Sequence, residues 1–84
     1  MNKENEKPIK RFRRGGVEAA IWKQQTEDRL SFTVQLNKRF RDKAGEYRNT
    51  TVFLGADMLK VERVAELADN WIHDQLETAR GNDA

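Results

Sequence analysis

Polar and apolar residues alternate along two stretches in the first half of the chain, a pattern typical of half-buried β-strands. The first stretch covers residues 17–22. The clearest one covers residues 30–37, where Leu, Phe, Val and Leu alternate with Ser, Thr, Gln and Asn. A segment rich in Thr, Val and Phe predicts a further strand over residues 47–54. The basic segment 9–14 is either a fourth short strand or an extension of the N-terminal tail.

The segments that join these strands set the expected register. Gly15-Gly16 marks a bend, residues 24–29 form a polar loop, and residues 41–46 form a hairpin loop in which Gly45 is free to adopt a left-handed conformation. Pairing about these loops places Val17 opposite Leu36, and Leu36 opposite Thr51. One sheet face is then apolar. The other carries Glu18, Ala20, Trp22, Ser31, Thr33, Gln35, Asn37, Arg39, Arg48 and Thr50.

A long amphipathic helix is predicted over residues 58–79, with Asp57 as its N-cap. Its apolar positions cover about half of the helix circumference, which is wider than the stripe that packing on one sheet requires. We therefore expect a homodimer formed helix on helix, with a larger ring as an alternative. In the other alternative the helix packs only on its own sheet. The expected dimer interface comprises Val64, Leu67, Ala68, Trp71 and Ile72.

These elements predict an α+β fold, with an antiparallel sheet of three or four strands followed by one long C-terminal helix. We expect a single domain over residues 9–80, a flexible tail over residues 1–8 and a flexible C-terminus over residues 81–84. The 84 residues include no cysteine, and no stretch resembles a signal peptide or a membrane span. The expected location is the cytoplasm.

Charge is distributed unevenly along the chain. Residues 1–48 carry 13 Lys and Arg against 7 Asp and Glu, whereas residues 49–84 carry 3 against 7. The tetrapeptide KRFR occurs twice, at residues 10–13 and 38–41. Such asymmetry indicates that the first half binds a polyanion. The alternative is a solvated basic surface balanced by an acidic helix.

Trp22 is unusual because the expected register places it among polar side chains. Aromatic rings within a basic groove are what single-stranded nucleic acid requires, since bases stack on the rings while Lys and Arg neutralise phosphates. We therefore expect a module that binds single strands with little sequence preference and assists transcription, replication or repair. The alternative is a dimeric regulatory module whose basic face binds an acidic protein, with Phe12 and Phe40 packed at a sheet edge. The candidate binding residues are Lys10, Arg11, Arg13, Arg14, Trp22, Lys23, Asn37, Lys38, Arg39, Phe40, Arg41, Lys43 and Arg48.

Two segments carry a resemblance to a known family. VEAAIWK at residues 17–23 and LNKRFRDKAGE at residues 36–46 resemble the second strand, and the third strand with its loop, of the positive-cofactor-four family. This similarity to single-stranded-DNA-binding transcription coactivators extends over residues 9–76. It implies a ββββα fold, dimerisation through the helices, and DNA rather than RNA as ligand. The opening KRFR and the strand that follows it also resemble small bacterial proteins without an assigned function.

The resemblance further implies that Trp22 and Phe40 stack on bases, with Lys23, Arg39 and Arg41 beside them. The chain departs from the family in three ways. Residues 50–54 lack the lysine of the family's fourth strand, and the helix has Trp71 in place of an early tryptophan. Strict alternation from Leu30 also points Phe40 inward, so its outward role requires a twist or bulge near Lys38.

Catalytic and metal-binding patterns are weak. His73 lies one helical turn after Asp69, but such a pair on an acidic helix is typical of a solvated face. No cysteine nucleophile exists, and no serine has a histidine and an acid at recognisable spacing. The glycines match no phosphate-binding loop. We expect no enzyme activity, no metal and no cofactor.

Overall fold

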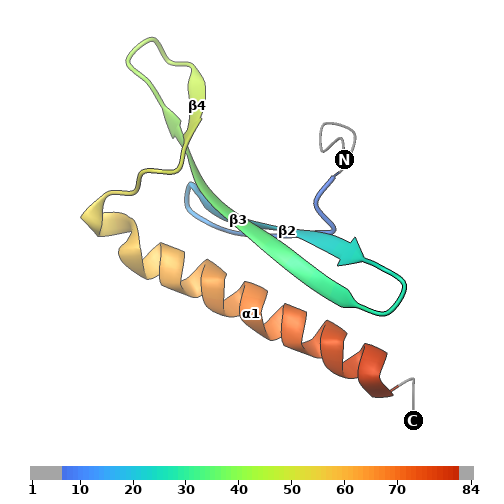
Figure 1. Ribbon diagram of the computed structural model, residues 1–84. Helices are drawn as coiled ribbons and strands as arrows, with labels where there is room; N and C mark the ends of the chain where they lie inside the picture. The colour runs from blue at the N-terminus through green and yellow to red at the C-terminus, as the bar shows by residue number, and fades with distance from the viewer. Residues whose placement is uncertain (1–6, 82–84) are drawn as a thin grey trace.

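The computed structural model describes residues 7–81 and has the ββββα arrangement that the alternation and the helical pattern predicted. Four antiparallel strands pair in chain order, and one helix lies along the sheet (Figure 1). The expected tail at residues 1–8 falls largely outside the described residues, as do residues 82–84. The elements are β1 (Lys10–Arg14), β2 (Val17–Gln25), β3 (Leu30–Arg41), β4 (Tyr47–Thr50), a 3₁₀ turn (Gly55–Asp57) and α1 (Met58–Gly81).

Strands β2 and β3 pair two residues away from the expected register. Val17 lies opposite Lys38, not Leu36. The cause is the β2–β3 connection, which is shorter than expected because β2 continues through Gln25. The turn closes with a hydrogen bond in which the Thr26 N–H donates to the Arg29 carbonyl oxygen at 2.9 Å. A shift of two residues leaves every side chain on its expected face.

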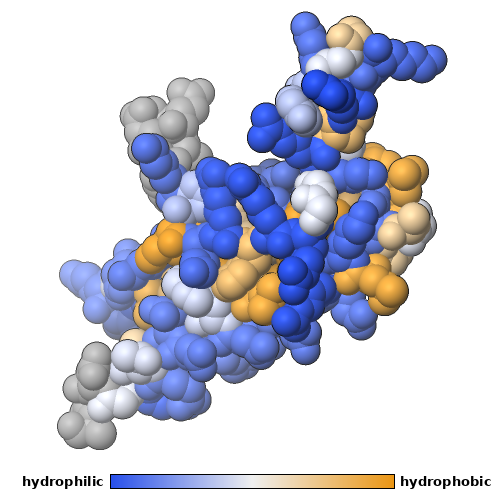
Figure 2. Space-filling view, turned by 180° about the vertical axis from the view of Figure 1, so that it is seen from behind, coloured by the Kyte–Doolittle hydropathy of each residue, from blue (hydrophilic) through white to orange (hydrophobic). Residues whose placement is uncertain are grey.

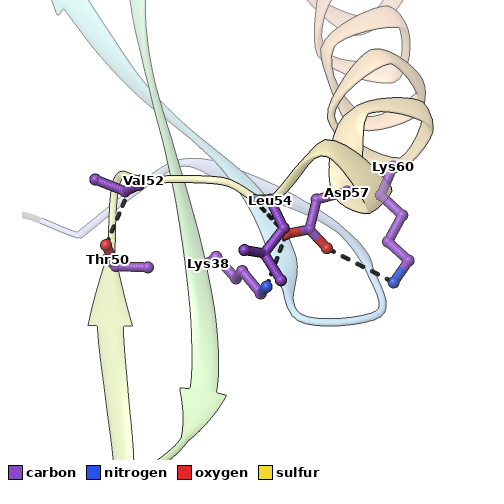
Figure 3. Close-up of polar contacts among 6 residues, drawn as sticks. All are labelled: Lys38, Thr50, Val52, Leu54, Asp57 and Lys60. Atoms are coloured by element: carbon purple, nitrogen blue, oxygen red, sulfur yellow. Dashed lines mark hydrogen bonds and ion pairs between the residues drawn. The ribbon is translucent and has the colours of Figure 1, made fainter.

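Strand β4 departs further from expectation, because it ends at Thr50 and not at residue 54. Lys38 lies opposite Thr50, which places Thr50 and Arg48 on the helix side of the sheet and not on the opposite face. The pairing of β3 with β4 is thus shifted by one residue from the expected register. The shift arises because β3 continues through Arg41, which shortens the hairpin loop. The strand ends where the Thr50 hydroxyl accepts the Val52 N–H at 3.0 Å (Figure 3).

The core lies between the helix and the first three strands. Val17, Ala19 and Ile21 of β2 pack against Val64 and Ala68 of α1. At the margin of this core the rings of Phe32 and Trp71 pack edge to face, with their centroids 5.4 Å apart. The other partly buried residues around this core are Phe12, Leu36, Phe53, Val61 and Ile72.

This packing corrects two positions of the expected dimer interface, Val64 and Ala68. Val64 is 0% exposed and Ala68 is 2% exposed under the protein's own sheet. Trp71 and Ile72 pack against the same core, and Leu67 is partly buried. Val64 and Ala68 therefore belong to the core of the single chain and are not accessible to a second helix, whereas Leu67, Trp71 and Ile72 stay partly exposed.

Asp57 precedes α1, but its carboxylate does not cap the helix as expected. Oδ2 accepts the Leu54 N–H at 3.0 Å and the Lys38 ammonium at 2.7 Å, and Oδ1 lies 3.9 Å from Lys60 Nζ (Figure 3). The hydrogen bond from Lys38, followed by that from Leu54, holds the pKa of Asp57 below its ordinary value. Asp57 therefore ties the segment before the helix to β3.

The end of β3 and β4 form a hairpin that stands away from the body of the protein (Figure 1). Hydrophilic side chains cover much of this hairpin (Figure 2). No helix within residues 7–81 combines the length and the apolar character that crossing a membrane requires.

Candidate nucleic-acid interface

Strand register divides the expected binding residues between the two faces of the sheet. The face away from α1, called the outer face here, receives Arg11, Arg13, Trp22, Asn37, Arg39 and Arg41. The helix-side face receives Lys10, Arg14, Lys23, Lys38, Phe40 and Arg48. Lys43 lies in the hairpin loop and is exposed.

A cleft of ≈ 570 Å³ opens on the outer face. Strand β1 contributes two arginines to it, β3 contributes Asn37 and Arg39, and β4 contributes Tyr47 and Asn49. The cleft thus combines cations, amides and one aromatic ring from three strands. Its complete lining is Arg11, Arg13, Gly15, Gly16, Glu18, Asn37, Arg39, Tyr47 and Asn49.

The Gly15-Gly16 turn explains how β1 and the far part of β3 meet in one cleft. Gly15 has a φ of 57°, which L-residues with side chains rarely adopt. The Arg39 N–H donates to the Gly16 carbonyl oxygen at 2.8 Å, so the turn docks directly on β3. A Cβ atom at Gly16 would lie 2.4 Å from the Arg39 carbonyl oxygen. Only glycine permits this close approach, which carries the end of β1 to β3.

The charges in the cleft are predominantly positive. Arg13 Nε forms an ion pair with Glu18 Oε2 at 2.6 Å, which neutralises one of the three arginines. Within residues 7–81, no ion pair involves Arg11 or Arg39. Two guanidinium groups therefore remain available to an anionic ligand.

Tyr47 is the aromatic residue of the cleft, and the sequence patterns did not identify it. Tyr47 is 60% exposed, and the Arg39 guanidinium carbon lies over its ring, 4.4 Å from the ring centroid. The expected register placed Tyr47 opposite Phe40, whereas the structure pairs it with Arg41 and thereby brings it to the outer face.

The structure does not bring Phe40 to this site. Phe40 lies opposite Arg48 on the helix-side face, because β3 is continuous and has no bulge near Lys38. Trp22 and Phe40 are therefore on opposite faces and cannot stack on the same strand as a pair. Lys38 is likewise withdrawn from the surface, since its side chain is 18% exposed and paired with Asp57.

Trp22 lies on the outer face but outside the arginine-lined cleft. It is partly buried and borders a separate hollow with Thr33 and Gln35. Its Nε1 atom is buried and has no hydrogen-bond partner among residues 7–81. A ligand in the cleft reaches Trp22 only by extending along β3 past Gln35.

The hairpin that carries Tyr47 is held by one carboxylate. Asp42 Oδ1 accepts the N–H groups of Ala44 and Glu46, and Oδ2 accepts Arg48 Nε at 2.5 Å. The Arg48 hydrogen bond is the largest cause of a lowered pKa at Asp42, followed by that from Glu46. Arg48 is thus engaged within the hairpin, and the loop geometry fixes the position of Tyr47.

The histidine and aspartate of the helix that the sequence pointed to form a surface pair. His73 Nδ1 lies 3.3 Å from Asp69 Oδ1, and contact with the Asp69 backbone carbonyl and carboxylate raises its pKa. Both side chains are well exposed. In the part of the chain that the structure describes, no three His, Cys, Asp or Glu side chains are grouped to hold a metal ion.

Comparison with models of protein families found none that matches the chain, and comparisons with curated proteins and with solved structures gave no match either.

Proposed function

We propose that the outer face of the sheet binds single-stranded nucleic acid, in a mode that tolerates many sequences. The observation that carries the proposal is the cleft in which Arg11, Arg39 and Tyr47 meet. Arginines neutralise phosphates without reading sequence, and every base offers a π-face to an exposed ring. The cleft supplies both kinds of contact within one short stretch of the surface.

A single strand fits this site better than a duplex does. In a duplex the base faces are stacked on one another and cannot reach Tyr47. A single strand can turn one base onto the ring while its phosphates remain near the arginines. The polar track along β3 leads from the cleft past Asn37 and Gln35 toward Trp22, where a further base can be received. The family resemblance favours DNA over RNA as the natural ligand.

The alternative ligand is an acidic segment of another protein. Carboxylates would pair with Arg11 and Arg39 equally well. Such a ligand, however, gives no role to the exposed Tyr47 ring beside them. This aromatic component of the cleft favours nucleic acid.

Fluorescence anisotropy with a labelled single-stranded oligonucleotide, its duplex and an acidic peptide tests the proposal. We expect the single strand to bind most tightly, and log K to fall linearly with log salt. The two phosphate contacts of Arg11 and Arg39 correspond to a slope of roughly −1.4 for a single strand. Equal binding of duplex and single strand would contradict the proposal. Preferential binding of the peptide would support the alternative.

A further inference from the structure

The edge of β3 is open over most of its length. β4 pairs only with Lys38–Arg41, whereas β3 begins at Leu30. Among the described residues, the segment 30–37 therefore has a neighbouring strand on one side only. Figure 1 shows β4 beside the far end of β3, with the rest of β3 extending past it.

The hydrogen-bonding direction of each residue in this segment follows from one contact. The Arg39 N–H donates to Gly16, on the β2 side of β3. Because direction alternates along an antiparallel strand, Thr33 and Gln35 also face β2. Phe32, Val34 and Leu36 then direct their N–H and C=O groups to the open edge. Within residues 7–81 no turn, loop or side-chain hydrogen bond reaches these groups.

The open edge lacks the features that keep sheet edges apart. Residues 31–37 read SFTVQLN, with no charge and no proline, and the β2 pairing runs through them without a bulge. Lysines, prolines and bulges are the usual means by which monomeric proteins prevent strand pairing between molecules. Their absence here indicates that the edge is covered when the protein functions.

The exposure of Val34 also indicates that a further strand covers this edge of the sheet. It lies opposite Ile21 on the helix-side face, where Ile21 is 0% exposed. Val34 itself is 42% exposed, because α1 covers β1 and β2 more fully than β3. An apolar side chain and an unpaired backbone thus coincide at one position of the sheet.

We infer that a second copy of this chain covers the edge, by antiparallel pairing of β3 with β3 about a two-fold axis near Val34. In this arrangement Val34 faces the partner's Val34, and Phe32 faces the partner's Leu36. The segment is self-complementary, so one contact closes both open edges. It is also uncharged, so the pairing places no like charges directly opposite each other, unlike a pairing through the basic hairpin.

The pairing has a consequence for the shape of the assembly. The two sheets join into one sheet with both α1 helices on the same side. The two outer faces form one surface, which presents two arginine-lined clefts. This dimer interface does not use the helix positions that the single chain buries in its own core, and it does not depend on the nucleic-acid proposal.

Sedimentation of the intact chain and of two matched variants tests the inference. We expect the wild type to sediment at twice the chain mass of 9.8 kDa. Val34→Lys places a charge at the edge and should weaken self-association about tenfold or more, without unfolding the chain, since Val34 is already exposed. Val52→Lys makes the same substitution at a valine that is 75% exposed and should remain dimeric.

Hydrogen exchange of the wild type provides a second measurement, which needs no folded variant. In the dimer the amides of Phe32, Val34 and Leu36 should be protected, and dilution should remove this protection. The amides of Thr33 and Gln35 should stay protected at both concentrations, because they bond to β2. A monomer at the highest soluble concentration, or a Val34→Lys variant that associates as the wild type does, would overturn the inference.

Discussion

The guanidinium carbon of Arg39 lies 4.4 Å from the centroid of the Tyr47 ring, a contact that joins β3 to β4 on the outer face. Arg41, two residues further along β3, lies 5.4 Å from the same centroid. Tyr47 as a whole nevertheless remains 60% exposed. A base can therefore reach Tyr47 while the adjacent phosphates lie near cations.

Replacing Tyr47 with alanine should weaken single-strand binding by about 1–3 kcal/mol, or roughly 5- to 150-fold. The loss arises from base stacking, so the slope of log K against log salt should hardly change. Tyr47→Phe keeps the ring and should bind nearly as the wild type does. Anisotropy titrations at several salt concentrations measure both quantities.

Phe40→Ala is the matched control for Tyr47→Ala. Phe40 is also aromatic and partly accessible, at 37%, but it lies on the helix-side face. Its removal should leave single-strand binding unchanged. If Phe40→Ala weakens binding and Tyr47→Ala does not, the ligand lies on the other face of the sheet.

Replacing both Arg11 and Arg39 with alanine should flatten the salt dependence of binding. Each phosphate contact removed lowers the slope by about 0.7 for a single strand, so the pair should lower it by roughly 1.4. The effect should depend little on base composition, because phosphates carry no sequence information. Lys10→Ala with Lys23→Ala removes the same charge from the helix-side face and should change the slope far less.

The strands and the helix could be predicted because their signals are local. Alternation from Leu30 to Asn37 and the apolar arc of α1 each arise within one element. The register could not be predicted as well, since it depends on where each loop closes. The continuation of β3 to Arg41 was not predicted. It places Arg48 on the helix side of the sheet and Tyr47 on the outer face.

The composition of the candidate site was predictable only in part. Arg11, Arg13, Asn37 and Arg39 follow from alternation once the strands are known. Lys38 was expected to contact phosphate but pairs with Asp57, a residue 19 positions later in the chain. No local sequence pattern predicts such a contact, because it forms only when the helix packs on the sheet.

The ion pair between Lys38 and Asp57 should make stability depend on pH in the acidic range. The folded-state pKa of Asp57 lies below its ordinary value, so ionisation of this carboxyl stabilises the folded state. That contribution is fully present above the unfolded pKa, about 3.9, and is lost as pH falls through the lower folded value. Thermal melts between neutral and acidic pH should show this loss in the wild type.

Asp57→Asn identifies the group responsible for this loss. The variant should melt at a lower temperature than the wild type near neutral pH, and the difference should shrink as the pH falls below about 4. Glu66→Gln removes the exposed Arg63–Glu66 pair and should alter stability much less. A constant difference between wild type and Asp57→Asn at all pH values would show that charge at Asp57 is not the cause.

Gly16→Ala should both destabilise the fold and impair binding, because Gly16 positions the backbone of the cleft. The added Cβ would lie 2.4 Å from the Arg39 carbonyl oxygen, so the turn or β3 must move. Overpacking of this kind costs about 1–3 kcal/mol, which chemical denaturation can measure. Displacement of Arg39 should also weaken single-strand binding at conditions where the variant is fully folded.

Gly55→Ala is the matched control, since no atom lies within 4 Å of a Cβ built there. Equal stability of the two variants would mean that the β1–β2 turn does not dock on β3 in solution.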